Sequence, residues 1–98
     1  MSEKYLACQI VEETADNRIV TGKLIDGSSF KIRVPYWEVV AAKESPMQAG
    51  WLLVELIGED LENKKSTVRL SAPDQKLGHN ICVANKDLRQ VADIQRGE

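Results

Sequence analysis

The sequence predicts a mainly β protein, a small six-stranded antiparallel barrel with one short helix before the fourth strand and a weak C-terminal helix. The longest apolar run, Trp51 to Gly58, follows a glycine and precedes an acidic loop, and its length and borders are typical of a strand. Elsewhere apolar and polar residues alternate in short segments, which is the period of half-buried strands. The run is therefore expected to be the central strand.

Three strands are expected before it, at Lys4 to Glu12, Arg18 to Ile25 and Ser29 to Val34. Asp26-Gly27 with two serines favours a hairpin turn between the second and third strands.

The register of these strands follows from the rule that directly opposite residues share a face. Pairing Leu6 with Leu24 and Ile10 with Val20, and then Leu24 with Phe30, gives the three strands one apolar face. The same register places Lys23 opposite Lys31 on the other face, a mildly destabilising pair unless an anion or a carboxylate lies close by.

The short helix is expected after the third strand. Pro35 suits the first turn of a helix and Glu38 suits its positive end. The helix would continue from Val39 to Lys43 and stop before Pro46.

After the central strand, Thr67 to Ser71 alternates cleanly and predicts its partner. Placing Leu56 opposite Val68, and Val54 opposite Leu70, also places Glu55 opposite Arg69, which favours this register through a cross-strand ion pair.

The remaining segments complete the six strands. Ala72 to Asn80 is expected to be a polar loop and Ile81 to Ala84 the sixth strand. Asn85 suits the cap of a final weak helix, Lys86 to about Gln95. This order of elements resembles OB-like and SH3-like barrels, folds that host many unrelated functions, and residues 1–98 are expected to form one such domain.

Composition limits the function classes. The net charge is −2 and the pI near 5.4, so the overall field gives nucleic acid or an anionic membrane no general attraction. No apolar stretch approaches the length of a membrane span, and the N-terminus does not look like a leader. A cytoplasmic protein without a cofactor is expected.

Catalytic and metal-binding patterns are weak. The chain has a single histidine, no nucleophile motif and no glycine-rich phosphate loop, so we expect it not to be an enzyme, and no small-molecule substrate is identified. His79 and Cys82 have a spacing at which two ligands reach one zinc, with Cys8 or Asp74 as candidates to complete the set. Structural zinc needs four ligands, usually two close pairs, so we expect no metal.

Two surfaces remain as binding candidates. The second face of the central strand carries Trp51, Leu53 and Ile57, which need covering by the chain's own helices and loops or by a partner, and Trp37 lies in the expected helix. The prediction is a non-catalytic protein-interaction or accessory module whose partner is another protein or, through self-association, a second copy of the chain.

The alternative is an OB-like protein that binds single-stranded nucleic acid. Lys23, Lys31 and Arg33 would form a basic strand face, with Tyr36 at its margin to stack a base. Such binders usually carry aromatic residues on the strands themselves, and this face has none.

Overall fold

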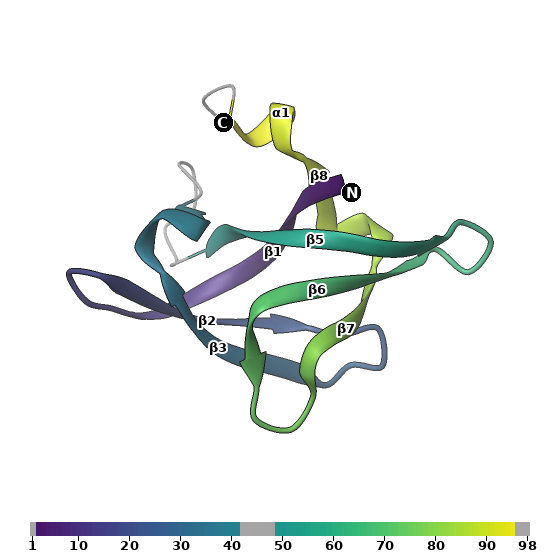
Figure 1. Ribbon diagram of the computed structural model, residues 1–98. Coiled ribbons are helices and arrows are strands. Elements are labelled where there is room, and N and C mark those ends of the chain that lie inside the picture. Colours follow the sequence, from purple (N-terminus) through teal and green to yellow (C-terminus); the bar gives the residue numbers. More distant parts are fainter. Residues whose placement is uncertain (1, 42–48, 96–98) are drawn as a thin grey trace.

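The computed structural model describes residues 2–41 and 49–95, and it shows an antiparallel sheet curled into an open half-barrel (Figure 1). The predicted fold class, a mainly β chain forming a small antiparallel barrel, is confirmed, although the described residues form eight strands instead of six. The strands are β1 (Ser2–Glu13), β2 (Asn17–Lys23), β3 (Ser29–Pro35), β4 (Val39–Ala41), β5 (Ala49–Asp60), β6 (Lys65–Asp74), β7 (Gly78–Ala84) and β8 (Leu88–Gln90). The helical elements are the 3₁₀ turns η1 (Tyr36–Glu38) and η2 (Asn85–Asp87) and the short helix α1 (Val91–Gln95).

The strand order is β3-β2-β1-β5-β6-β7, with β4 added to β5 and β8 added to β1. The predicted central strand is confirmed as β5, which pairs with β1 along one edge and with β4 and then β6 along the other. Alternate residues of the strands point inward and form one apolar core, as the period of two requires. The most deeply buried core side chains are Leu6, Val20, Phe30, Val34, Leu52, Val68, Leu70 and Val83.

Several predicted pairings are confirmed. Ile10 lies opposite Val20, and Leu56 lies opposite Val68 beside the Glu55–Arg69 pair. The predicted pairing of Leu6 with Leu24 is wrong, because β8 occupies that edge of β1 and places Leu88 there.

The predicted register between β2 and β3 is wrong by two residues. Gly22 lies opposite Phe30, and Lys23 lies opposite Ser29 instead of Lys31. A Cβ on residue 22 would lie 2.6 Å from the Phe30 ring, so the missing side chain makes room for the aromatic one. A shift of two residues keeps every side chain on its predicted face, and alternation alone therefore cannot distinguish the two registers.

The helix expected from Val39 to Lys43 is wrong where the structure describes it. The turn η1 ends at Glu38, and Val39 begins strand β4. Val39 lies opposite Leu52, and Val40 lies opposite Trp51. The two β-branched residues fit a sheet better than a helix, and the edge of β5 offers them backbone partners. Residues 42–48 lie outside the described residues.

The C-terminal helix and the long polar loop are also shorter than predicted. Leu88 leaves the expected helix and packs against the core in β8, so α1 covers only five residues. The loop expected at Ala72 to Asn80 is mostly strand, and residues 75–77 alone connect β6 to β7. Asp74 makes this tight turn by accepting the N–H groups of Lys76 and Leu77.

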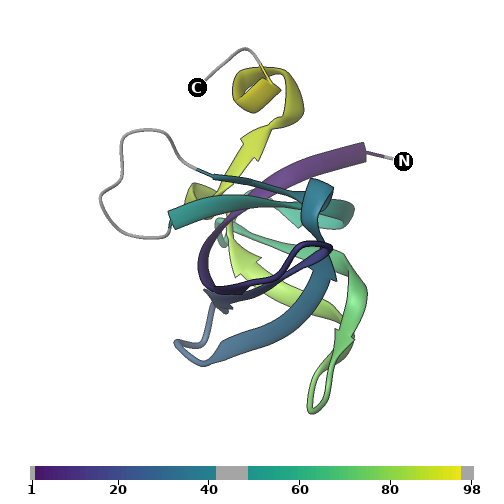
Figure 2. The same ribbon diagram turned by 90° about the vertical axis from the view of Figure 1, so that its left-hand side faces the viewer.

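Strand β3 faces β6 across the open seam of the half-barrel (Figures 1 and 2). Asp74 Oδ2 accepts the backbone N–H of Lys31 at 2.9 Å, and Cys82 O accepts the N–H of Ile25 at 2.9 Å. These bonds bridge the seam without a backbone ladder between β3 and β6.

Arg18 closes one end of the barrel. Its side chain is buried, donates to Val39 O at 2.6 Å and to Glu13 at 2.8 Å, and lies 3.8 Å from the centre of the Tyr36 ring. A guanidinium can be buried here because two of its nitrogens donate hydrogen bonds and its planar face lies over an aromatic ring.

Candidate functional site

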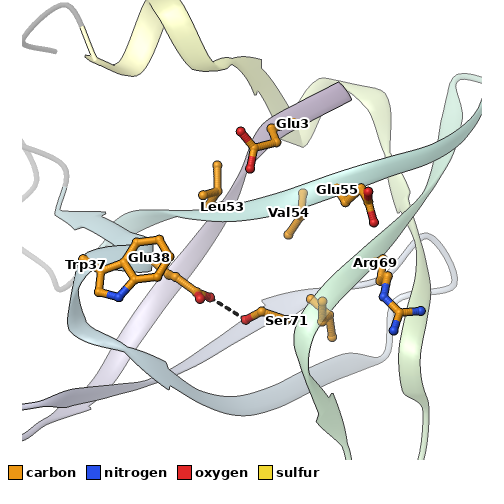
Figure 3. A pocket seen from close by; sticks show the side chains of 9 residues that line it. Glu3, Trp37, Glu38, Leu53, Val54, Glu55, Arg69 and Ser71 are labelled. Atoms are coloured by element: carbon orange, nitrogen blue, oxygen red, sulfur yellow. Dashed lines mark hydrogen bonds between the residues drawn. The ribbon is translucent and has the colours of Figure 1, made fainter. Parts of the chain in front are cut away.

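A pocket of about 280 Å³ opens where the second edge of β5 passes from β4 to β6. Neither strand pairs with β5 at Leu53 and Val54, so the sheet leaves an interval there. We call this the Trp37 pocket, and Figure 3 shows its lining. The lining residues are Glu3, Trp37, Glu38, Leu53, Val54, Glu55, Arg69, Leu70 and Ser71.

Trp37 stands on the rim of the pocket. It belongs to η1, the turn that joins β3 to β4, and its side chain is 69% exposed. Figure 3 shows its indole on the same side of the pocket as Glu38 and near Leu53. A large aromatic side chain exposed to this degree beside a pocket is typical of a binding surface.

Glu38 lies in the wall of the pocket and is only 7% exposed. The hydroxyl of Ser71 on β6 donates a hydrogen bond to its Oε1 (Figure 3). This bond joins η1 to β6 across the seam. A carboxylate at this depth requires such a partner, because burial without hydrogen bonds is costly.

A row of charged residues crosses the strands at the other side of the pocket. Glu3 on β1 lies directly opposite Glu55 on β5, and Glu55 lies opposite Arg69 on β6. The predicted ion pair between Glu55 and Arg69 does not form, since within residues 2–41 and 49–95 the one salt bridge is between Arg18 and Glu13. The pocket thus combines three carboxylates with one guanidinium.

The four residues predicted for the interaction surface separate into two groups. Trp37 and Leu53 line the pocket together. Trp51 lies on the same face of β5 as Leu53 but outside the pocket, partly buried, with the guanidinium of Arg89 5.3 Å from its ring. Ile57 is 50% exposed and lies at an irregularity of the β5–β6 ladder, farther along the hairpin.

Part of the outer face of β1 and β5 is covered by the chain itself. The helix α1 contacts β1 and β8. Tyr5 on β1 and Ile94 on α1 are both buried, although neither belongs to the main core cluster. The C-terminal segment therefore covers the end of this face near Tyr5, while Trp37 remains exposed.

The basic residues proposed for nucleic acid lie on β2 and β3. Lys23, Lys31 and Arg33 are all exposed, but Lys31 lies opposite Thr21 and Arg33 opposite Ile19. Tyr36 is 44% exposed, and the Arg18 guanidinium lies over one face of its ring. One face of the Tyr36 ring is therefore covered by Arg18 and cannot stack on a base.

The structure does not bring together the residues considered for zinc. The Nδ1 atom of His79 lies 2.9 Å from the carbonyl oxygen of Leu70. Cys82 alternates with the buried residues Ile81 and Val83 and so points to the outer face. Asp74 is occupied by three backbone N–H groups. Across the part of the chain that the structure describes, no group of three or more His, Cys, Asp or Glu side chains is placed to hold a metal ion.

Cys8 is a core residue with an inert thiol. Burial raises its pKa to about 12, an effect that the positive charge of Arg18 partly opposes. Because the thiolate is the reactive form, a thiol with this pKa is a poor nucleophile at neutral pH.

Sequence reasoning missed Glu3, Glu38 and Ser71 as members of one site. The sequence pattern indicates a charge at a helix terminus for Glu38 and the end of a strand for Ser71. The two residues come together only because η1 and β6 meet in the folded sheet. The direct pairing of Glu3 with Glu55 also depends on which strand lies beside β5.

Comparisons with known proteins gave no match: no protein-family model matches the chain, and neither the curated proteins nor the solved structures contain a similar one at the threshold applied. Among the described residues, no helix is long and apolar enough to cross a membrane.

Proposed function

We propose that the protein is a non-catalytic interaction module that binds another protein through the Trp37 pocket. The observation that carries this proposal is the 69% exposed indole of Trp37 beside a pocket with an apolar wall at Leu53. Tryptophan is enriched among the residues that dominate binding energy at protein interfaces, and a neighbouring cavity offers space for a partner's side chain.

The lack of an assembled reactive group supports a binding role. Catalysis needs a nucleophile, acid or base with a positioned partner. Within the described residues, the thiol of Cys8 is inert and His79 is bonded to a backbone carbonyl. Cytoplasmic location and the use of an OB-like scaffold belong to the same proposal. The neighbour order β3-β2-β1-β5-β6, with β3 facing β6, supports an OB-like arrangement over an SH3-like one.

Site-specific photocrosslinking tests this function. A benzophenone amino acid replaces Trp37 in one variant and Leu61 in a control, because Leu61 is 73% exposed at the tip of the β5–β6 hairpin, away from the pocket. The variants are irradiated in cells that naturally make the protein. We expect a discrete protein adduct from position 37 that excess unmodified protein competes away, and none from position 61. Equal adducts from both positions, or no competable adduct from position 37, would contradict the proposal.

The same experiment examines self-association. An adduct of twice the chain mass at position 37 would identify a second copy as the partner. Sedimentation velocity of the unmodified protein would then show a dimer that dissociates on dilution.

A second candidate function is binding of single-stranded nucleic acid on the outer face of β2 and β3. In an OB-like barrel this face and the adjacent loops are the usual binding surface. Lys23, Lys31 and Arg33 are all exposed on it. Against this candidate, Lys23 is offset from Lys31 and Tyr36 has one ring face covered by Arg18.

A further inference from the structure

We propose that the Trp37 pocket recognises a cationic side chain, an arginine or a lysine in a basic segment of the partner protein. This inference rests on the proposed function and adds the chemistry of the partner. It comes from the charges that line the pocket, from the buried carboxylate in its wall and from the placement of the indole.

The pocket lining contains a like-charge pair that no salt bridge among the described residues neutralises. Glu3 and Glu55 lie directly opposite each other on adjacent strands, where two carboxylates repel. Arg69 is the cross-strand neighbour of Glu55, yet its guanidinium forms no salt bridge within 4.0 Å in the described part of the chain. A cation entering the pocket would relieve the repulsion between the two carboxylates.

Glu38 is the second group in the pocket that would attract a cation. Its Oε1 accepts the Ser71 hydroxyl, whereas the described residues provide no donor for Oε2. A carboxylate that is 7% exposed and lines the pocket would accept a strong hydrogen bond from a charged donor that enters it.

The aromatic and apolar wall of the pocket suits the stem of a long cationic side chain. Trp37 stands on the rim with Leu53 beside it, and Figure 3 shows Glu38 on the same side of the pocket. The methylene stem of an arginine or lysine packs against apolar surface while its charged head reaches a carboxylate. The face of an indole also attracts cations. Three carboxylates against one guanidinium leave the lining net negative, so the charge of the occupant is specified.

The test uses the two tryptophans as internal reporters, since the chain contains only Trp37 and Trp51. Their indole N–H signals are assigned with Trp37→Phe and followed by ¹H–¹⁵N NMR. The probes are short acetylated and amidated peptides that have glycine and leucine around one central residue. That residue is arginine, lysine, citrulline or glutamate. Citrulline matches arginine in shape but has no charge.

We expect the arginine and lysine peptides to shift the Trp37 indole signal while the Trp51 signal stays in place. The citrulline peptide should bind at least about tenfold more weakly, as the loss of a hydrogen bond between charged groups predicts. Binding should also weaken between about 50 and about 200 mM salt, because screening reduces attraction at exposed sites.

Glu38→Gln keeps the side-chain shape and an oxygen for Ser71, and it should reduce the affinity for the arginine peptide about tenfold. Glu62→Gln removes the same charge from the exposed β5–β6 loop and should leave the affinity unchanged. An unchanged NMR spectrum of each variant away from the substituted residue shows that the fold is intact.

Three results would overturn the inference. Equal binding of the arginine and citrulline peptides would remove charge recognition while leaving protein binding at the pocket in place. Preferential binding of the glutamate peptide would make Arg69 the recognition residue. If no peptide shifts the Trp37 signal, the pocket does not recognise a cationic side chain, and the crosslinking experiment decides separately whether it binds protein.

Discussion

The carboxylate of Asp74 accepts the backbone N–H of Lys31 at 2.9 Å, across 43 residues of sequence. The same carboxylate organises the β6–β7 turn through Lys76 and Leu77. The Asp74 side chain therefore stabilises the β6–β7 turn and also binds the edge strand β3 across the barrel seam.

Acid is expected to weaken this contact between Asp74 and β3. The N–H groups of Lys31 and then Lys76 hold the pKa of Asp74 below its ordinary value of 3.8. A carboxyl group whose pKa is lower in the folded state than in the unfolded state stabilises the fold. This contribution is complete above the unfolded-state pKa and is lost as the pH falls through the folded-state pKa. Urea unfolding at about pH 6 and about pH 3 should therefore show a smaller pH effect on the free energy of unfolding in Asp74→Asn than in the unaltered protein.

Asp93→Asn is the control for this prediction, because Asp93 is exposed on α1, and α1 packs on β1 and β8 instead of on the seam. It should retain the pH effect of the unaltered protein. An Asp74→Asn variant that also retained the full effect would show that the seam bond adds nothing to stability.

Gly22→Ala is expected to destabilise the fold by about 1–3 kcal/mol through overpacking. The new methyl group would lie 2.6 Å from the ring of Phe30, which is fully buried in the core cluster. The free energy of unfolding in urea measures the effect. Gly58→Ala is the matched control, since a Cβ there meets no atom within 4 Å.

Replacing Phe30 by Leu in the Gly22→Ala background should recover part of the lost stability, because the smaller side chain vacates the contact. If Gly22→Ala were as stable as Gly58→Ala, the close approach that sets the β2–β3 register would be refuted.

Arg18→Met should reduce stability by on the order of 2 kcal/mol, the scale of buried hydrogen bonds made by a charged group. The change removes the donors to Val39 O and Glu13 and the cation over the Tyr36 ring, and it keeps an apolar stem of similar length. Glu13→Gln should cost under about 1 kcal/mol, since the Glu13 side chain is 44% exposed. Equal losses for the two variants, measured by urea unfolding, would mean that the salt bridge alone accounts for the role of Arg18.

Single-stranded RNA and DNA are expected not to bind tightly, because the β2–β3 face has no aromatic platform among its basic residues. Fluorescence anisotropy with labelled oligonucleotide pools at about 50 and about 200 mM salt measures this, since phosphate contacts weaken steeply over that range. Salt-sensitive binding that the Lys31→Glu, Arg33→Glu double variant abolishes would instead establish the nucleic-acid function.

The sequence predicted the strands well because alternation with period two is a local signal. Ile10 and Val20, or Leu56 and Val68, can be paired from their pattern alone. The same signal repeats every two residues, so it could not decide whether Phe30 faces Gly22 or Leu24, and packing decided it.

The failures share a second cause. Val39 and Val40 form a strand because β5 lies beside them. The local sequence cannot predict this, since strand formation depends on the neighbouring strand. The Trp37 pocket depends on the same long-range arrangement. Trp37 could be selected as a candidate by its size, but Glu3 on β1 and Ser71 on β6 are far apart in the sequence and line one pocket only in the curled sheet.

Arg18 and Asp74 hold the barrel together through chemically different contacts. A guanidinium keeps its charge at every pH that a protein meets, and a backbone carbonyl and an aromatic ring are among its partners. The seam is held in part by Asp74, whose lowered pKa keeps its carboxylate charged until strong acid protonates it. Acidification would therefore weaken the Asp74 contact between β3 and β6 while the contacts of Arg18 with Val39 O and the Tyr36 ring keep their chemistry.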